Sequence, residues 1–134
     1  MKVLFFGTPY FSEIVLKSLV EKHQVVGVVC QIDKPANRGK KLVSPNIKKL
    51  AESMNIKVYQ FDRLKENLET FKEIDCDIFV TASYGKILPK ELLDMKLCIN
   101  VHPSMLPKYR GATPIQTALL NGDKRTGVSI MKTD

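Results

Sequence analysis

Apolar and amphipathic segments alternate along the chain. The apolar ones predict strands, because a strand covered on both faces of a parallel sheet is apolar almost throughout: "KVLFF" (2–6), "QVVGVVC" (24–30), "KVYQ" (57–60), "CDIFVTA" (76–82), "LCINV" (97–101) and "TGVSIMK" (126–132). Apolar residues at helical spacing predict helices over 9–22, 44–54, 65–72 and 113–122, the first two capped by Thr8–Pro9 and Ser44–Pro45. Residues 31–43 predict a polar loop.

Strands that alternate with helices predict an α/β fold with a doubly wound, mostly parallel sheet. The length of 134 residues fits one domain. There is no internal repeat, low-complexity tract or linker that would divide the chain. We therefore expect a single domain over residues 1–134.

Composition narrows the class of protein. Hydrophobic residues make up 44% and charged residues 26%, as in globular proteins, and no apolar run is long enough to span a membrane. The first residues already predict a strand, so we expect no leader segment and a cytoplasmic location. The three cysteines form no CxxC pair, which favours reduced core thiols. His23 and His102 lie far from any cysteine pair, so we expect no metal.

The basic residues are unevenly distributed. The net charge is +7, and residues 34–51 contain six basic side chains and no acid: Lys34, Arg38, Lys40, Lys41, Lys48 and Lys49. Such a cluster is typical of a surface that binds a polyanion. A solvated loop followed by an ordinary helix face explains it equally well, with Lys48 and Lys49 more simply assigned to that face.

In a doubly wound sheet, ligands bind beyond the carboxyl ends of the strands. Four predicted strand ends carry unusual residues, and we expect them to meet at one edge: "FGTPYF", the basic loop, "ASYGKILP" and residues 100–111. Gly7 stands alone in "GTPYFS", which fits neither a dinucleotide fingerprint nor a P-loop. A tight turn that caps a helix is the simpler interpretation of Gly7 and Thr8.

Asn100 and His102 are the strongest candidates for chemistry. Residues two apart in a strand face the same side, so an amide and an imidazole would project together. Both side chains could simply satisfy local backbone groups, since unpaired polar groups are costly to bury. The pair also suits a developing oxyanion, and His102 could carry a proton. No nucleophilic Ser or Cys is evident, which favours direct transfer over a covalent intermediate.

Three segments resemble the formyltransferases that use 10-formyltetrahydrofolate: "FFGTPYFS" (5–12), "NVHPSMLPKYRGATPIQ" (100–116) and "NGDKRTGVSIMKTD" (121–134). The resemblance covers essentially the whole chain. The loop "DKPANRGKKLVSPNIKKLA" (33–51) resembles the tRNA-contacting insertion of the branch that formylates methionyl initiator tRNA. Sugar-nucleotide formyltransferases share the "LPKYRG" turn but usually lack this segment, and the glycinamide ribonucleotide branch departs from "YRGATPIQ".

The resemblance implies a role for each candidate residue. Asn100 and His102 would bind the oxyanion and help to move the proton. The donor 10-formyltetrahydrofolate would lie against Ala82, Tyr84, Gly85, Lys86, Ile87 and Leu88, with the backbone of 84–88 reading the pterin. Ile87 and Leu88 would supply an apolar wall, although core packing is an equal alternative for each. Arg38, Lys40 and Lys41 would grip the phosphates of the initiator methionyl-tRNA. A monomer is expected.

The sequence departs from the family's pattern in one respect. A third catalytic residue, an Asp, would fall shortly after Asp134, where the sequence ends. Further sheet elements and a C-terminal β-barrel domain of the family would also follow. We therefore expect an incomplete catalytic domain, and these 134 residues alone to be inactive or nearly so. Two alternatives stay open: a formyltransferase for an amino-sugar nucleotide, and a non-catalytic module that binds folate or RNA.

Overall fold

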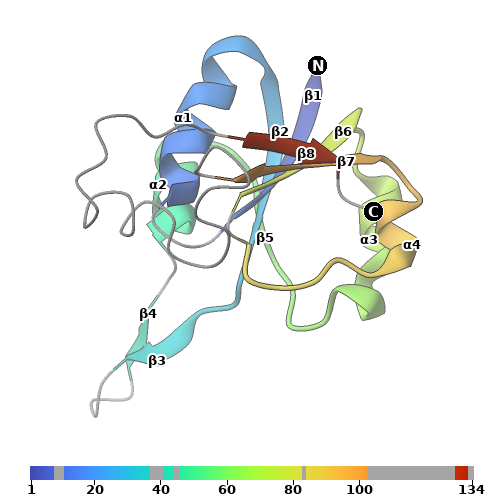
Figure 1. Ribbon diagram of the computed structural model, residues 1–134. Helices are drawn as coiled ribbons and strands as arrows, with labels where there is room; N and C mark the ends of the chain where they lie inside the picture. Colours follow the sequence, from blue (N-terminus) through green and yellow to red (C-terminus); the bar gives the residue numbers. More distant parts are fainter. Residues whose placement is uncertain (8–10, 37–40, 44–45, 83, 103–128, 133–134) are drawn as a thin grey trace, which may run out of the picture.

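The main sheet runs through the middle of the molecule in the order β5-β2-β1-β6-β7-β8 (Figure 1). The computed structural model describes residues 1–7, 11–36, 41–43, 46–82, 84–102 and 129–132. The strands of this sheet are β1 (Lys2–Gly7), β2 (Gln24–Cys30), β5 (Val58–Gln60), β6 (Ile78–Ala82), β7 (Leu97–His102) and β8 (Ser129–Lys132).

All pairs in this sheet are parallel except β7 with β8, which is antiparallel. The chain builds outward from β1 to β2 and β5, then returns to the other side of β1 with β6 and β7. This is the order of the doubly wound nucleotide-binding folds, and its direction reverses between β1 and β6. The prediction of a mostly parallel, doubly wound α/β fold is confirmed.

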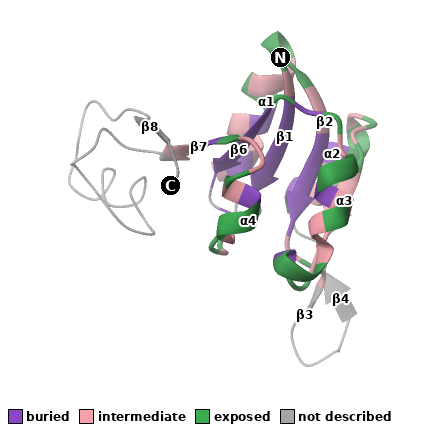
Figure 2. Ribbon diagram, turned by 90° about the vertical axis from the view of Figure 1, so that its right-hand side faces the viewer, coloured by how far each residue is buried: buried purple, intermediate pink, exposed green. Residues whose placement is uncertain are grey.

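Helices cover both faces of the sheet (Figure 1). Helices α1 (Phe11–Lys22) and α2 (Asn46–Ser53) pack on one face. The short helix η1 (Leu64–Asn67), α3 (Leu68–Glu73) and α4 (Lys90–Leu93) pack on the other. The strands between these layers are the most deeply buried part of the chain (Figure 2). None of the described helices has the length and apolar character to cross a membrane.

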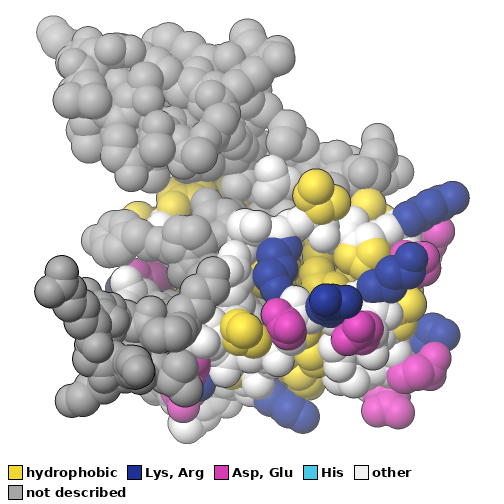
Figure 3. All heavy atoms as spheres, turned by 90° about the horizontal axis from the view of Figure 1, so that it is seen from below, with side chains coloured by type: hydrophobic (Ala, Val, Ile, Leu, Met, Phe, Trp, Pro, Cys, Tyr) yellow, Lys and Arg dark blue, Asp and Glu magenta, His cyan; other side chains and the backbone are white. Residues whose placement is uncertain are grey.

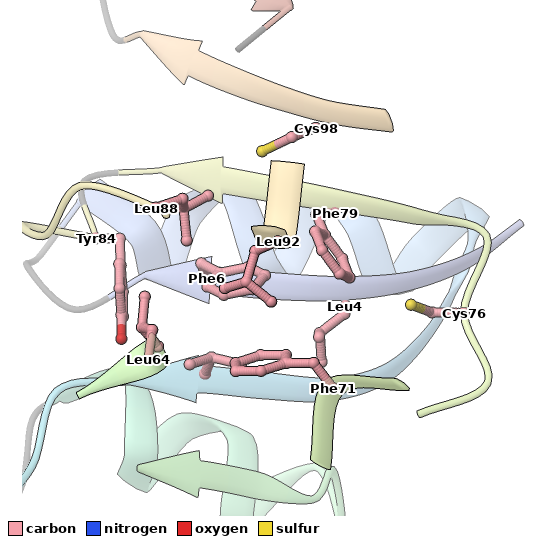
Figure 4. Packing of buried hydrophobic residues seen from close by; sticks show 11 residues of the cluster. Leu4, Phe6, Leu64, Phe71, Cys76, Phe79, Tyr84, Leu88, Leu92 and Cys98 are labelled. Atoms are coloured by element: carbon pink, nitrogen blue, oxygen red, sulfur yellow. The ribbon is translucent and has the colours of Figure 1, made fainter. Parts of the chain in front are cut away.

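Aromatic rings fill the core beneath η1, α3 and α4 (Figure 4). The Phe6 ring stacks on Phe71 with ring centroids 5.9 Å apart, and it meets Phe79 at 5.4 Å and Tyr84 at 5.5 Å edge to face. Each such pair adds about 0.5–1.5 kcal/mol beyond the burial of apolar area. Because Tyr84 follows β6, the same cluster fixes the start of the loop beyond that strand.

Gly7 belongs to β1, where it pairs with Ala82, so the prediction of a tight turn at Gly7 is wrong. A Cβ atom at Gly7 would lie 2.5 Å from the Ser12 Cβ of α1 and 3.0 Å from the Ala82 carbonyl oxygen. No real side chain tolerates such contacts, so the missing Cβ lets α1 and β6 approach the end of β1 closely. The predicted cap at Thr8 and Pro9 lies outside the described residues.

The prediction of an unbroken polar loop over 31–43 is wrong. This segment contains an antiparallel hairpin of β3 (Lys34–Ala36) and β4 (Lys41–Val43). Three-residue strands with Pro35 and two lysines show no apolar alternation, so the pattern gave no sign of them. The predicted helix over 65–72 corresponds to η1 followed by α3. Helix α4 was not predicted. The predicted helix 113–122 and the cap Ser44–Pro45 lie outside the described residues.

Candidate active site at the carboxyl edge of the sheet

Parallel pairing brings the predicted strand ends together at one edge. Gly7 pairs with Ala82, Thr81 pairs with Asn100, and Phe6 pairs with Val29 immediately before the end of β2. The expectation that these ends meet is therefore confirmed. Figure 3, seen from the side on which β1 and β2 end, shows apolar side chains interspersed with Lys, Arg, Asp and Glu.

The Asn100 side chain is held by its neighbour on β6. The Thr81 hydroxyl donates a hydrogen bond of 2.9 Å to Asn100 Oδ1, and Thr81 is only 7% exposed. Because the amide oxygen faces Thr81, the Nδ2 group with its two N–H donors lies on the other branch of the amide. A fixed amide donor at a sheet edge is suited to hold a carbonyl oxygen that becomes an oxyanion.

The predicted alternation along β7 is confirmed for Cys98 to Val101. Cys98 lies in the core beneath α3 and α4, whereas Ile99 and Val101 pack with the core beneath α1 and α2. Asn100 shares the face of Cys98, and the backbone of His102, two residues on, pairs with Ser129 of β8. The His102 side chain lies outside the described part of the structure.

The segment after β6 divides its residues between the core and the surface. Tyr84 and Leu88 are buried in the aromatic cluster, so Leu88 packs as a core residue (Figure 4). Ile87 is 95% exposed, and its apolar side chain is therefore available to a ligand. Lys86 points back toward the residues that follow β5, where its Nζ donates a hydrogen bond of 2.6 Å to the Asp62 carbonyl oxygen.

Gln31 ties this segment to the end of β2. Gln31 Nε2 donates a hydrogen bond of 2.9 Å to the Tyr84 backbone carbonyl oxygen, and the Gln31 backbone carbonyl oxygen accepts one of 2.9 Å from Gln60 Nε2. Gly85 has a φ of +85°. The positive φ favours glycine, and a Cβ there would lie 2.4 Å from Gln31 Nε2, so a side chain at this position would displace Gln31. Sequence reasoning missed Gln31, because a single Gln after a strand carries no distinctive signal.

The basic hairpin is anchored at its base by a second polar group. Lys48 Nζ lies 3.2 Å from Asp33 Oδ2, and Gln60 Nε2 donates a 2.7 Å hydrogen bond to Asp33 Oδ1. Assigning Lys48 to a solvated helix face was therefore wrong, because its side chain is only 22% exposed and paired.

Figure 1 shows the hairpin projecting away from the main sheet. Lys41 begins β4, and its side chain is not among those described. Arg38 and Lys40 lie outside the described residues. The structure thus describes the two strands that flank Arg38 and Lys40 in the sequence, and the polar contacts of Asp33 just before the first of them.

Burial raises the pKa of two groups near this edge. Burial, with a smaller effect of nearby Cys30, raises the pKa of Tyr84 to about 12. Burial raises the pKa of Cys30 to about 11. Cys30, Cys76 and Cys98 are all buried free thiols. In the part of the chain that the structure describes, no three His, Cys, Asp or Glu side chains are grouped to hold a metal ion.

The strand order and the polar residues at the ends of the strands define a doubly wound α/β protein. Its candidate site lies beyond the carboxyl ends of β1, β6 and β7. Solved structures share this fold. Phosphoribosylglycinamide formyltransferase from Bacillus halodurans superposes with a TM-score of 0.69 at 22% identity, over 100% of this chain and 72% of that one. A 4-N formyltransferase from Francisella tularensis superposes with a TM-score of 0.61 at 18% identity, over 99% of this chain and 50% of that one.

Sequence comparison gives the family. Residues 1–134 match the family described as formyl transferase, and the chain belongs to that family. It is 48% identical to "Methionyl-tRNA formyltransferase" of Dictyoglomus thermophilum, over 98% of this chain and 44% of that protein. It is 49% identical to the protein of the same name from Acetivibrio thermocellus, over 100% and 45%. The chain therefore spans less than half the length of these curated relatives.

Proposed function

We propose that the protein containing these residues transfers a formyl group from 10-formyltetrahydrofolate to the α-amine of methionyl initiator tRNA. The supporting observation is the identity of 48–50% with relatives named methionyl-tRNA formyltransferase, which extends over 98–100% of the chain. The solved glycinamide ribonucleotide and 4-N formyltransferases share only the fold, at 22% and 18% identity. On this proposal the protein works in the cytoplasm as a monomer.

The proposed reaction needs an oxyanion donor and a route for one proton. The amine nitrogen forms a bond to the formyl carbon, and the formyl oxygen becomes an oxyanion in a tetrahedral intermediate. The bond from that carbon to the folate nitrogen then breaks, and the folate nitrogen gains the proton that the amine loses. Asn100 Nδ2 donates to the oxyanion, and His102 helps to move the proton.

The donor would lie against residues 82–88. A backbone that is fixed by Gln31 and by the buried Tyr84 ring can present its N–H and C=O groups to a pterin in one geometry. Ile87 supplies exposed apolar surface. Ala82 and Leu88 are buried and would support this backbone from the core, and Lys86 would hold it through its hydrogen bond to the Asp62 carbonyl oxygen.

The acceptor would be gripped by the basic hairpin. Lys41 begins the second strand of a projecting hairpin whose base is fixed by Asp33 and Lys48, and Arg38 and Lys40 lie between its two strands in the sequence. A projecting element can reach an RNA end that is too large to enter the sheet edge. Contacts of these cations with phosphates release counterions, so the affinity for tRNA falls as salt rises.

The test uses the full-length natural protein and three assays of formyl transfer from 10-formyltetrahydrofolate. The acceptors are methionyl initiator tRNA, an amino-sugar nucleotide and glycinamide ribonucleotide. We expect transfer to the tRNA. Replacing Arg38, Lys40 and Lys41 with Ala should raise KM for tRNA and flatten its salt dependence. Transfer to a small acceptor alone would refute the tRNA proposal, and binding of tRNA without any turnover would favour a non-catalytic module.

A matched control separates local contacts from the loss of net charge. Lys17, Lys22 and Lys72 are exposed lysines on α1 and α3. Their replacement with Ala removes the same three charges from surfaces remote from the hairpin. We expect the control variant to keep the wild-type KM and salt slope. Equal losses in the two variants would mean that only the overall charge matters.

A further inference from the structure

Thr81 is a polar residue in a strand that is otherwise apolar. The strand β6 reads "IFVTA", and every residue in it is buried. A hydroxyl at such a position must find a partner, because burying it unpaired is costly. Its side-chain hydrogen bond is to Asn100 Oδ1, the candidate oxyanion donor on the adjacent strand.

We infer that Thr81 is a positioning residue that sets which end of the Asn100 amide faces the reacting carbonyl. This inference rests on the proposed function. An Asn amide has an oxygen acceptor at one end and a nitrogen donor at the other, and the two ends have almost the same shape. Only the Nδ2 end stabilises an oxyanion, whereas the Oδ1 end repels it. A hydroxyl that donates to Oδ1 selects the productive orientation.

The backbone makes this selection rigid. Thr81 and Asn100 are direct partners in the parallel pairing of β6 and β7, and their side chains project from the same face. Phe79 and Cys98, two residues earlier on each strand, are buried in the aromatic cluster on that face. The distance between the hydroxyl and the amide is therefore fixed by the sheet and not by a loop.

Two substitutions separate the hydroxyl from the shape of the side chain. Thr81→Val keeps the branched shape and removes the donor, and Thr81→Ser keeps the donor. A neutral hydrogen bond of ordinary strength corresponds to a fall in kcat of about three- to tenfold for Thr81→Val. KM for the folate donor should stay within about twofold, because Thr81 acts on the transition state through Asn100. Thr81→Ser should keep most of kcat.

The kinetic test includes a double variant. In an Asn100→Ala background, Thr81→Val should cause no further loss, since there is no amide left to orient. A full additional loss in that background would overturn the inference in favour of a purely structural role. The comparison is made with whichever acceptor the full-length protein formylates. If that acceptor is an amino-sugar nucleotide, the tRNA proposal fails while the role of Thr81 is still tested.

A second readout needs no substrate. The full-length protein is labelled with ¹⁵N-asparagine, and the Asn100 side-chain amide is assigned by its loss in Asn100→Ala. We expect one sharp pair of signals in the wild type and in Thr81→Ser, and shifted or exchange-broadened signals in Thr81→Val. Unchanged Asn100 signals in Thr81→Val would overturn the inference, whatever the protein formylates.

Discussion

Gly85 provides a sharp test of how the loop after β6 is held. The substitution Gly85→Ala places a Cβ on a backbone with φ of +85°, a region that L-residues avoid at a cost of about 1–2 kcal/mol. The new Cβ would also meet Gln31 Nε2 at 2.4 Å. Gln31 must then move away, and its 2.9 Å hydrogen bond to the Tyr84 carbonyl oxygen is lost, at about 1 kcal/mol.

The two effects together lower the free energy of unfolding by about 2–3 kcal/mol. Gln31→Ala separates them. In that background the new Cβ meets no side chain at position 31, so Gly85→Ala should cost only the backbone strain of about 1–2 kcal/mol. The double variant is thus predicted to lose less than the sum of the two single variants.

Urea unfolding followed by circular dichroism measures the four free energies, and KM for the folate donor is measured in parallel. We expect KM to rise in Gly85→Ala, because this backbone lines the proposed donor site. Additive losses of free energy would refute the described position of the Gln31 side chain beside residue 85. A Gly85→Ala protein as stable as the wild type would refute the backbone conformation itself.

Two further predictions concern the core and its titration. Phe71 is buried in the aromatic cluster, so Phe71→Ala should lower the free energy of unfolding by about 3–5 kcal/mol. Leu97 is 48% exposed, so Leu97→Ala should cost well under half of that. Equal losses in urea unfolding would contradict the described core. Folding raises the pKa of Cys30 from 9.0 to about 11 and the pKa of Tyr84 from 10.0 to about 12. The stability that these two protonated groups contribute is therefore complete below pH 9.0 and is lost as the pH rises toward 12. Unfolding measured across this range should show the fall, and a constant free energy up to pH 11 would contradict it.

The elements that could be predicted from the sequence were those with a strong pattern. Local signals identified these elements: the continuous apolar runs of β1, β2, β6 and β7, and the helical spacing of α1. The hairpin of β3 and β4 has no such signal. Its position depends on contacts between residues distant in sequence, such as Asp33 with Lys48 and Gln60. Local periodicity cannot reveal tertiary anchoring of this kind.

The site was predicted unevenly for the same reason. Asn100 was found because an amide at the end of an apolar strand is conspicuous, and the parallel order then placed it at the expected edge. Thr81 was missed, although a Thr within an apolar strand is a visible anomaly. Its importance depends on the register that pairs it with Asn100, which the sequence does not contain. Gln31 acts through a side-chain contact that only the fold creates.

The most direct test of the proposed chemistry is a single-turnover measurement on the full-length protein. Formyl transfer from 10-formyltetrahydrofolate to methionyl initiator tRNA is followed for the wild type and for Asn100→Ala. Loss of one oxyanion donor should slow the chemical step by about a hundred- to a thousandfold while the affinity for the donor changes little. If the wild type leaves the tRNA unformylated, or if Asn100→Ala transfers formyl at the wild-type rate, the proposed role of this edge is contradicted.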